Sequence, residues 1–524
     1  MDAVQSVLDA IAGFLWGPFV LIPLLLGTGI YMTFRLGGIQ FLRTGAALNL
    51  GLIRRSDAGA SGDVSQYRAL ATAMAATVGT GNIAGVATAI ALGGPGAIFW
   101  MWVSGVFGMA LKYSESFLAV RFRQVDANGD RNGGPHYYLT KGIKGGLGVV
   151  LAGAFTAFTI IASFGIGNMV QGNSIAEAMS SSFSTPTWLT GILLAGITAV
   201  VLIGGVRSIS SAAGSVVPLM VVFFIVAQLW ILGSHVTEIP AAFATIFTDA
   251  FTGTAAVGGF VGAAVIAAIQ FGLARGLFSN ESGMGSAAIA AGAAQTSHPV
   301  RQGLVSMTQT FIDTIIMVTL TALVIVVTGA WQLADSAGDG LTGVVLTSTA
   351  FEMGLPGSFG GIVVAICLVL FATTTVWGWY YYGERATVRV FGTGAILPFK
   401  IIWVAASFVG CTIPLAMVWT LADIGNALMV IPNLLGILIL SGLIARETRA
   451  YLKFDPKLRA TQEEVDLALA DEPGYRDWRA NETRYDTQAL RLRGVDEDAV
   501  ESGSDDDFGD GLSVPAEPSP APER

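Results

Sequence analysis

A short polar stretch interrupts an apolar run early in this sequence, at residues 78–82, where the chain reads VGTGN. Two glycines around a threonine, followed by an asparagine, hold a regular helix poorly. A helix that unwinds there exposes backbone N–H groups at the start of one half and carbonyls at the end of the other. The N–H end suits a carboxylate, and the carbonyl end suits a cation. The stretch therefore predicts a binding site, while close packing through small residues is the structural alternative.

A second interruption lies within a later apolar run, at residues 270–283, where the chain reads QFGLARGLFSNESG. It carries two charged residues, Arg275 and Glu281. Charges at membrane depth are unfavourable, and they usually pair with one another or line a water path. We expect either an Arg275–Glu281 pair or a separate partner for each. An ion pair that only ties helices together is the structural alternative.

The elements that carry these two stretches are expected to lie in lipid. The chain has 524 residues, of which 53% are hydrophobic and only 12% are charged. An average soluble domain has roughly 25% charged residues. A water-soluble body could not bury this much apolar surface, so lipid must surround most of it. Cys367 and Cys411 both lie inside apolar runs, which argues against a disulfide framework. The sequence thus predicts an all-α polytopic membrane protein.

The number of spans follows from the length of the apolar runs, since a spanning helix needs about 20 mostly apolar residues. About eleven runs qualify, near residues 12–34, 66–92, 97–122, 148–180, 187–204, 212–234, 254–294, 301–330, 358–384, 394–419 and 423–445. The fourth and seventh exceed one crossing and contain Gly-, Ser- and Asn-rich interruptions. We therefore expect bends or breaks in both.

The charges of the loops support this span count. With the N-terminus outside, the inside loops hold Arg35, Arg43, Arg54, Arg55, Arg121, Arg123, Arg131, Lys141, Lys144, Arg207, Arg301, Arg385, Arg389, Lys400 and Arg446. The outside loops hold Glu238, Asp249, Asp335, Asp339, Glu352 and Asp423, with almost no Lys or Arg. Basic residues accumulate in cytoplasmic loops. The prediction is a multi-pass protein of the cell membrane, with its N-terminus outside and its C-terminal tail in the cytoplasm.

The order of the spans indicates two matching halves. With the first span set aside, spans two to six and seven to eleven form two sets of five, and an odd number inverts the second set. A broken first helix in each of two inverted halves is the pattern of LeuT-type transporters. We expect an N-terminal helix and loop at residues 1–65, one repeat at 66–235, another at 254–445, and a tail at 446–524.

The C-terminal tail differs from the rest of the chain in charge. From Glu447 onward it has 20 acidic and 10 basic residues, so it accounts for the net charge of −9 and the rest of the chain is nearly neutral. Blocks of acidic residues and a Pro-rich end are typical of solvated, partly disordered segments. The tail is therefore expected to be cytoplasmic, acidic and partly disordered.

Catalysis and pore formation are the competing functions. The chain has three histidines, at loops or span ends, and it contains no HExxH, CxxC, P-loop or Ser-His-Asp spacing. Because these catalytic patterns are missing, we expect neither an enzyme nor a cofactor. A channel would need a continuous pore, whereas broken helices around a midplane site favour a transporter that works by alternating access.

Several motifs extend the first interruption. They are ATAMAATVGTGNIAGVATAI at residues 71–90, GGPGAIFWMW at 93–102, KYSE at 112–115, GGPHYY at 133–138 and GLFSNE at 276–281. With these motifs the chain resembles the alanine or glycine:cation symporter family over about residues 10–450. The resemblance implies a LeuT-like fold and sodium-coupled uptake of a small neutral amino acid. The expected partners are that amino acid, sodium and the lipid bilayer, and no nucleic acid.

The resemblance also implies where the amino acid and the ion would bind. Backbone N–H groups of Thr80 and Gly81 would hold the carboxylate, and the Asn82 side chain would contact the amino acid or the ion. A sodium site would use the carbonyls of Ala75 and Val78 together with hydroxyls of the ninth span, for which we favour Thr373 and Thr374. Neutral oxygens bind sodium weakly enough for release. Hydroxyls bonded back to their own helix are the alternative.

The opposite wall of the predicted site is drawn from other spans. In the fourth span, Phe164, Asn168 and Gln171 share one helical face, and Phe164 would cap a methyl group while Gln171 accepts from the ammonium. Phe271 and Trp377 are candidate bulky walls, and Gly276 of the second interruption completes the substrate-binding set. Packing is the alternative role for each of these residues.

The coupling ion is the remaining open point. Spans two and nine lack a carboxylate that could carry a proton at the expected ion site, which favours sodium. Glu281 and Glu115 keep a proton-coupled transporter of the same fold as the alternative.

Overall fold

Helices build almost all of this computed structural model, which describes residues 2–17, 19–57, 59–126, 128–252, 261–335, 338, 340–357, 359–413, 416–482 and 485–486. Among these residues, six helices are long and apolar enough to cross a membrane, or eight if each of two bent helix pairs counts as one span. The predicted all-helical membrane fold is therefore confirmed, while the count of eleven spans stays a prediction. The start of the seventh predicted span, at residues 254–260, lies outside the described residues.

The N-terminal region and the first half of the protein extend to residue 234. Their elements are α1 (Asp2–Leu15), α2 (Leu21–Arg35), α3 (Ile39–Leu48), the π-helical η1 (Asn49–Arg54), β1 (Val64–Ser65), α4 (Gln66–Thr77), the π-helical η2 (Gly81–Gly85), α5 (Val86–Gly93), α6 (Ala97–Arg121), β2 (Gln124–Val125), β3 (Arg131–Asn132), α7 (Pro135–Gly142), α8 (Gly146–Phe164), the π-helical η3 (Gly165–Met169), α9 (Val170–Phe183), α10 (Thr187–Ile203) and α11 (Gly205–Ser234). The first predicted span, 12–34, thus corresponds to α2, and α1 precedes it as a separate helix.

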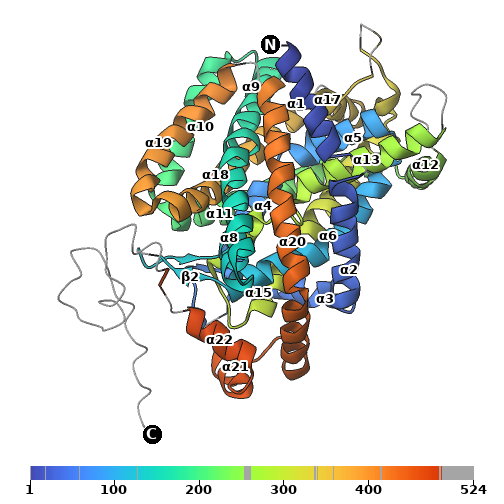
Figure 1. Ribbon diagram of the computed structural model, residues 1–524. Helices are drawn as coiled ribbons and strands as arrows, with labels where there is room; N and C mark the ends of the chain where they lie inside the picture. Colours follow the sequence, from blue (N-terminus) through green and yellow to red (C-terminus); the bar gives the residue numbers. More distant parts are fainter. Residues whose placement is uncertain are drawn as a thin grey trace.

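The second half and the tail follow. Their elements are α12 (Ile239–Thr252), α13 (Val261–Asn280), α14 (Ser286–Gly292), β4 (Ala294–Gln295), α15 (Pro299–Thr310), the π-helical η4 (Phe311–Val318), α16 (Thr319–Val327), the 3₁₀ turn η5 (Ala330–Gln332), α17 (Gly343–Gly354), α18 (Gly360–Phe391), the 3₁₀ turn η6 (Thr393–Ala395), α19 (Ile396–Thr412), α20 (Ala416–Phe454), α21 (Gln462–Leu469) and α22 (Pro473–Glu482). In Figure 1, α20 runs along the length of the molecule, and α21 and α22 lie at the end opposite the N-terminus.

Both predicted interruptions are breaks in the structure. The axis bends by 54° between α4 and the following segment Gly81–Gly93. In the second half, α13 ends at Asn280, and a turn at residues 281–285 separates it from α14. The fourth predicted span behaves differently. It is continuous over Gly146–Phe183 and accommodates its Gly- and Asn-containing stretch as the π-helical segment η3.

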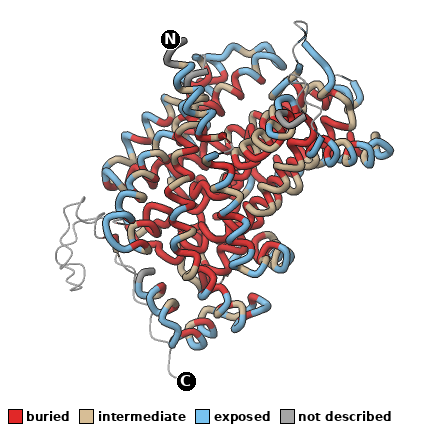
Figure 2. Tube along the Cα trace, turned by 45° about the vertical axis from the view of Figure 1, so that its right-hand side comes forward, coloured by how far each residue is buried: buried red, intermediate tan, exposed pale blue. Residues whose placement is uncertain are grey.

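The two broken spans lie at the centre of the molecule. Short strands connect them, because β1 precedes α4, β4 follows α14, and the two strands pair in parallel with Val64 opposite Ala294. The helix α6 packs against α13 and α15, and α18 packs against α4 and α9. Figure 2 shows buried residues concentrated in the middle of the bundle and exposed ones on its outer helices.

The first part of the tail is folded against the body. Around the His298 ring lie the aromatic rings of Tyr451, Tyr475 and Trp478. Further along, Asp486 is buried and accepts hydrogen bonds from Tyr137 at 3.0 Å and Arg389 at 2.6 Å. The tail thus docks at least as far as Asp486. Its remaining acidic and Pro-rich part, residues 487–524, lies outside the described residues.

Candidate functional site

The first break begins where the backbone of Val78 leaves the helical region, with φ −73° and ψ 92°. The Val78 N–H still donates to the carbonyl of Met74 at 2.8 Å, which ends α4. The side-chain oxygen of Asn82 then accepts from the Gly79 N–H at 3.2 Å. A side chain that bonds the backbone of its own turn stabilises a non-helical conformation. Asn82 therefore stabilises the non-helical backbone of the break through its side-chain oxygen.

The two glycines of the break allow two other helices to approach it. A Cβ at Gly79 would lie 2.7 Å from the hydroxyl of Thr375 on α18. A Cβ at Gly81 would lie 2.9 Å from the Cα of Ser279 on α13. Any larger residue would push these helices away. The glycines thus bring α18 and the second broken span directly onto the first break.

A small cavity lies between the two breaks. It leaves about 10 Å³ of space for the centre of a water molecule and is lined by Ala76, Thr77, Gly79, Thr80, Gly81, Ile166, Gln171, Phe278, Glu281, Met284, Thr375, Trp379 and Asn426. These residues come from both broken spans and from η3, α9, α18 and α20. A space of this size holds about one water molecule. The helices are therefore closely packed around the two breaks in this structure.

Two unpaired acceptors face this cavity. The side-chain oxygens of Gln171 and Asn426 are buried and have no hydrogen-bond partner among the described residues. The Gln171 amide nitrogen donates to the Ile166 carbonyl at 3.0 Å, which directs its oxygen elsewhere. Unsatisfied buried acceptors are unfavourable. A bound donor such as an ammonium group would satisfy them, and Glu281 lines the same cavity.

The hydroxyl that meets the first break is that of Thr375. It donates to the Ala75 carbonyl at 3.1 Å and to its own helix at Phe371, at 3.0 Å. The Thr374 hydroxyl points instead to the Phe371 carbonyl and to the sulfur of Met220, at 2.9 and 3.6 Å. Thr373 is only half-buried and does not line the cavity. Among the predicted ion ligands, Ala75 therefore meets Thr375 rather than Thr373 or Thr374.

Some of the residues predicted to form the opposite wall line the cavity, and others lie outside it. Gln171 lines the cavity, whereas Phe164 packs on Phe399 and Trp403, with ring centroids 5.3 and 5.2 Å away. Trp377 lies outside the cavity and Trp379 lines it. The reason is helical geometry, because 3.6 residues per turn put positions 375 and 379 on one face and 377 on the other.

Two further predicted residues belong to the surroundings of the cavity. Gly276 is a packing position, because a Cβ there would lie 2.3 Å from the hydroxyl of Ser104 on α6. Phe271 lines a separate cavity of about 170 Å³, together with Arg275 and Asp423. Phe278 borders both cavities, so this second space lies next to the central one.

Arg275 and Glu281 have separate surroundings. The Arg275 guanidinium lies over the Phe278 ring, 5.7 Å from its centroid. Glu281 accepts from the hydroxyl of Ser286 at 2.6 Å and faces the central cavity. Of the two expected arrangements, the structure shows separate partners rather than one pair.

A buried acidic residue adjoins the first break and was missed in the sequence. The carboxylate of Asp313, in η4, accepts from the Asn82 amide at 2.8 Å and from the hydroxyls of Ser279 and Thr314, both at 2.9 Å. Its side chain is fully buried. The available signal was a lone acidic residue within the eighth apolar run. Asn82, Ser279 and Asp313 thus form a polar cluster behind the central cavity.

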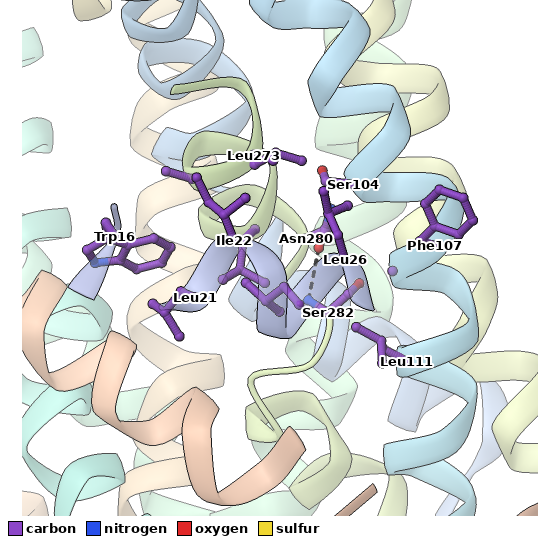
Figure 3. Close-up of a pocket in the computed structure, with 14 residues that line it drawn as sticks. Trp16, Leu21, Ile22, Leu26, Ser104, Phe107, Leu111, Leu273, Asn280 and Ser282 are labelled. Carbon is purple, nitrogen blue, oxygen red and sulfur yellow. Dashed lines mark hydrogen bonds between the residues drawn. The ribbon is translucent and has the colours of Figure 1, made fainter. Parts of the chain in front are cut away.

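A different cavity, drawn in Figure 3, lies between α2, α6 and α13. Leu21, Ile22 and Leu26 face Phe107 and Leu111 across it, and Asn280 accepts from the Ser282 N–H at 2.9 Å. Nearly all of its lining is apolar, so it lacks the convergent polar groups of a binding site. We interpret it as an imperfectly filled contact of the N-terminal helices.

Comparison with known proteins agrees with this architecture. Residues 1–465 match the model of the sodium:alanine symporter family. The chain is 49% identical to the sodium/alanine symporter AgcS of Methanococcus maripaludis over 452 residues, which cover 86% of this chain and 98% of AgcS. It is 37% identical to the probable sodium/glutamine symporter GlnT of Bacillus subtilis over 499 residues, 93% of this chain and all of GlnT.

The fold has a counterpart among solved structures. The LeuT-fold transporter MhsT, crystallised in complex with L-phenylalanine, superimposes with a TM-score of 0.52 at 16% identity, covering 80% of this chain and 100% of MhsT. The predicted LeuT-like fold is therefore confirmed. With its family match spanning most of the chain, this multi-pass membrane protein belongs to the sodium:alanine symporter family.

Proposed function

We propose that the protein is a sodium-coupled symporter that takes up alanine or glycine by alternating access. The observation that carries the proposal is the small cavity between two helix breaks, with the unpaired oxygens of Gln171 and Asn426 facing it. The ammonium group of an amino acid would bind these oxygens. Its carboxylate would bind the backbone N–H groups of Thr80 and Gly81 at the start of the second half-helix.

The walls of the cavity support a small substrate. The bulky side chains of Trp379 and Phe278 line it and would leave little room for a long side chain. The relatives are named for sodium with alanine and for sodium with glutamine. Of these two amino acids, alanine is the one that this cavity favours.

The coupling ion would bind at the end of α4. The carbonyl of Ala75 and the hydroxyl of Thr375 already converge there, and Val78 contributes a carbonyl from the non-helical backbone. Neutral oxygens of this kind suit a cation that must be released in each cycle. We further propose that the N-terminus faces the outside of the cell membrane and the tail faces the cytoplasm, as the loop charges predict.

Uptake by purified protein in liposomes tests the proposal. An inward sodium gradient should drive accumulation of radiolabelled alanine or glycine above the outside concentration, and glutamine should compete poorly. The matched control replaces the sodium gradient by an equal potassium gradient. Full accumulation without sodium would overturn sodium coupling, and nonsaturable flux without accumulation would point to a channel.

Substitution of Thr375 tests the ion site. Thr375→Val should raise the sodium concentration that gives half-maximal uptake by about tenfold, because a lost ligand of a cation costs at least one hydrogen-bond equivalent. Thr374→Val is the matched control, since the same change one residue away removes a hydroxyl directed at Met220 and Phe371. Equal effects of the two substitutions, or a larger one at Thr374, would move the ion site away from Thr375.

Proton coupling is the second candidate function, and Asp313 is the observation that favours it. A fully buried carboxylate next to a helix break can carry a proton across the membrane. Its contacts with Asn82 and Ser279 would link its charge to both broken spans.

A further inference from the structure

Two charged residues of the KYSE motif are buried in the body of the protein without lining the cavity. Lys112 and Glu115 lie one helical turn apart on α6, with 3.1 Å between the ammonium and a carboxylate oxygen, and both side chains are 0% exposed. Burying an ion pair is often no more favourable than burying apolar residues of the same size. Stability alone therefore does not account for charges at these two positions.

The pair holds the second break by its backbone. The Lys112 ammonium donates to the carbonyl of Glu281 at 3.0 Å, where the turn begins. A carboxylate oxygen of Glu115 accepts from the Gly285 N–H at 3.0 Å, where the turn ends. One donor and one acceptor on the same face of α6 thus bind the two ends of the turn at residues 281–285.

The helix α20 also binds this turn. The Asn433 amide on α20 donates to the Gly283 carbonyl in the middle of the turn at 2.8 Å, and to Glu115 at 3.2 Å. The Tyr138 hydroxyl donates to the Asn433 oxygen. The turn is therefore fixed at its beginning, middle and end from α6 and α20.

The turn needs such support because its backbone is strained. Glu281 has φ +54°, a left-handed conformation that a residue with a Cβ adopts rarely. Conformations of this kind persist only where the surrounding structure holds them. Two side chains of this turn, Glu281 and Met284, line the central cavity.

We propose that Lys112 and Glu115 are positioning residues for the substrate site. By holding the carbonyl of Glu281 and the N–H of Gly285, they set where the Glu281 carboxylate and the Met284 side chain lie in the cavity. They thereby set the apparent affinity for the amino acid from outside the cavity. This inference rests on the proposed function, because the affinity concerned is that for alanine or glycine.

A pair of double variants separates positioning from stability. K112M/E115L removes both charges of the pair together, so neither partner is left as an unpaired buried charge, and the variant is expected to remain folded. It also removes both partners of the turn, and the KM for sodium-driven alanine uptake should rise about tenfold. K112M/E115Q retains an amide oxygen for the Gly285 N–H, and its KM should rise about threefold.

Ser114→Ala is the matched control for these variants. Ser114 lies between the two residues on α6 and is buried, and its hydroxyl donates to the Ala110 carbonyl of its own helix at 2.7 Å. Its KM should not change. An unchanged KM in a folded K112M/E115L protein would overturn the proposal, as would equal KM values for the two double variants.

The position of the turn can also be measured directly. Met284→Cys places a thiol in the cavity, and the two native cysteines, Cys367 and Cys411, are buried. The rate at which a small methanethiosulfonate reagent labels this introduced thiol reports on the turn without any amino acid present. We expect K112M/E115L to change this rate at least threefold and Ser114→Ala to leave it unchanged.

The two measurements distinguish failure of this inference from failure of the proposed function. If the unmodified protein does not transport alanine, the proposed function fails, and the labelling rate still decides whether the pair holds the turn. If K112M/E115L does not fold, the same labelling of N433A, in which the turn loses only its middle contact, should change in the same direction. An unchanged rate in the folded variants would overturn the positioning role.

Discussion

Asp313→Asn should reduce sodium-driven alanine uptake about tenfold to a hundredfold while leaving the protein folded. The buried Asp313 carboxylate accepts three hydrogen bonds, from Asn82, Ser279 and Thr314. An amide offers one acceptor and one donor group, so at least one of these donors would face another donor. Losing hydrogen bonds to a charged group costs about 1.5–3 kcal/mol each. The change also removes the negative charge nearest to the first break.

Initial uptake rates in liposomes, measured over a range of sodium concentrations, check this prediction. Asp249→Asn is a matched control, because Asp249 is also buried and accepts from the Gly96 N–H at 2.7 Å, away from both breaks. Sodium-dependent uptake by Asp313→Asn at the unmodified rate would contradict the prediction. If uptake of the unmodified protein instead follows an inward proton gradient and is lost in Asp313→Asn, the second candidate function replaces the first.

Arg301→Ala should lower the free energy of unfolding by about 3–5 kcal/mol, because Arg301 binds the folded part of the tail. Arg301 lies in the first turn of α15 and forms ion pairs with the carboxylates of Asp57 and Asp455 at 2.7 and 2.8 Å. It also donates to the Tyr451 hydroxyl and to the Ala460 carbonyl, both at 2.5 Å. Removing the guanidinium leaves two carboxylates without their cation in a largely buried place.

Asp455 stays charged in this arrangement. Burial raises the pKa of Asp455. Hydrogen bonds from the backbone of Arg459 and from Arg301 lower it by a larger amount, so the net shift is downward. A carboxylate with a depressed pKa stabilises the folded state above its unfolded pKa, and this contribution is lost as the pH falls through the folded value. Arg301→Ala should therefore weaken the acid sensitivity of unfolding as well as stability.

Thermal unfolding in detergent checks this prediction. Arg476→Ala is the control, since the Arg476–Asp471 pair is solvent-exposed, with 64% and 103% of the side chains accessible. Exposed pairs contribute about 0–1 kcal/mol, so the melting temperature should hardly move. Similar shifts for the two variants would mean that the docked tail adds little to stability.

The sequence predicted the class of fold and the two helix breaks because those depend largely on local features. Apolar runs define membrane helices wherever they pack, and the glycines beside Thr80 and Asn82 weaken the helix that contains them. Polar residues within an apolar run likewise indicated the turn between Asn280 and Ser286.

The exact partners could not be predicted, because they depend on how helices rotate against one another. Thr373, Thr374 and Thr375 are chemically identical, and only the orientation of α18 selects the last of them. Asn426 and Asp313 lie in spans whose position beside the breaks follows from tertiary packing. A lone polar residue in an apolar run indicates a candidate site residue, but it does not indicate which side chain that residue will contact.

The docked tail has a practical consequence for expression and labelling. The match to the family ends at residue 465, yet Asp486 still bonds Tyr137 and Arg389. A chain boundary placed at residue 465 would remove Tyr475 and Trp478, and so expose the rings of His298 and Tyr451. Fluorescent reporters and affinity tags therefore belong after residue 486, where attachment leaves the contacts of Arg301 and Asp486 described above in place.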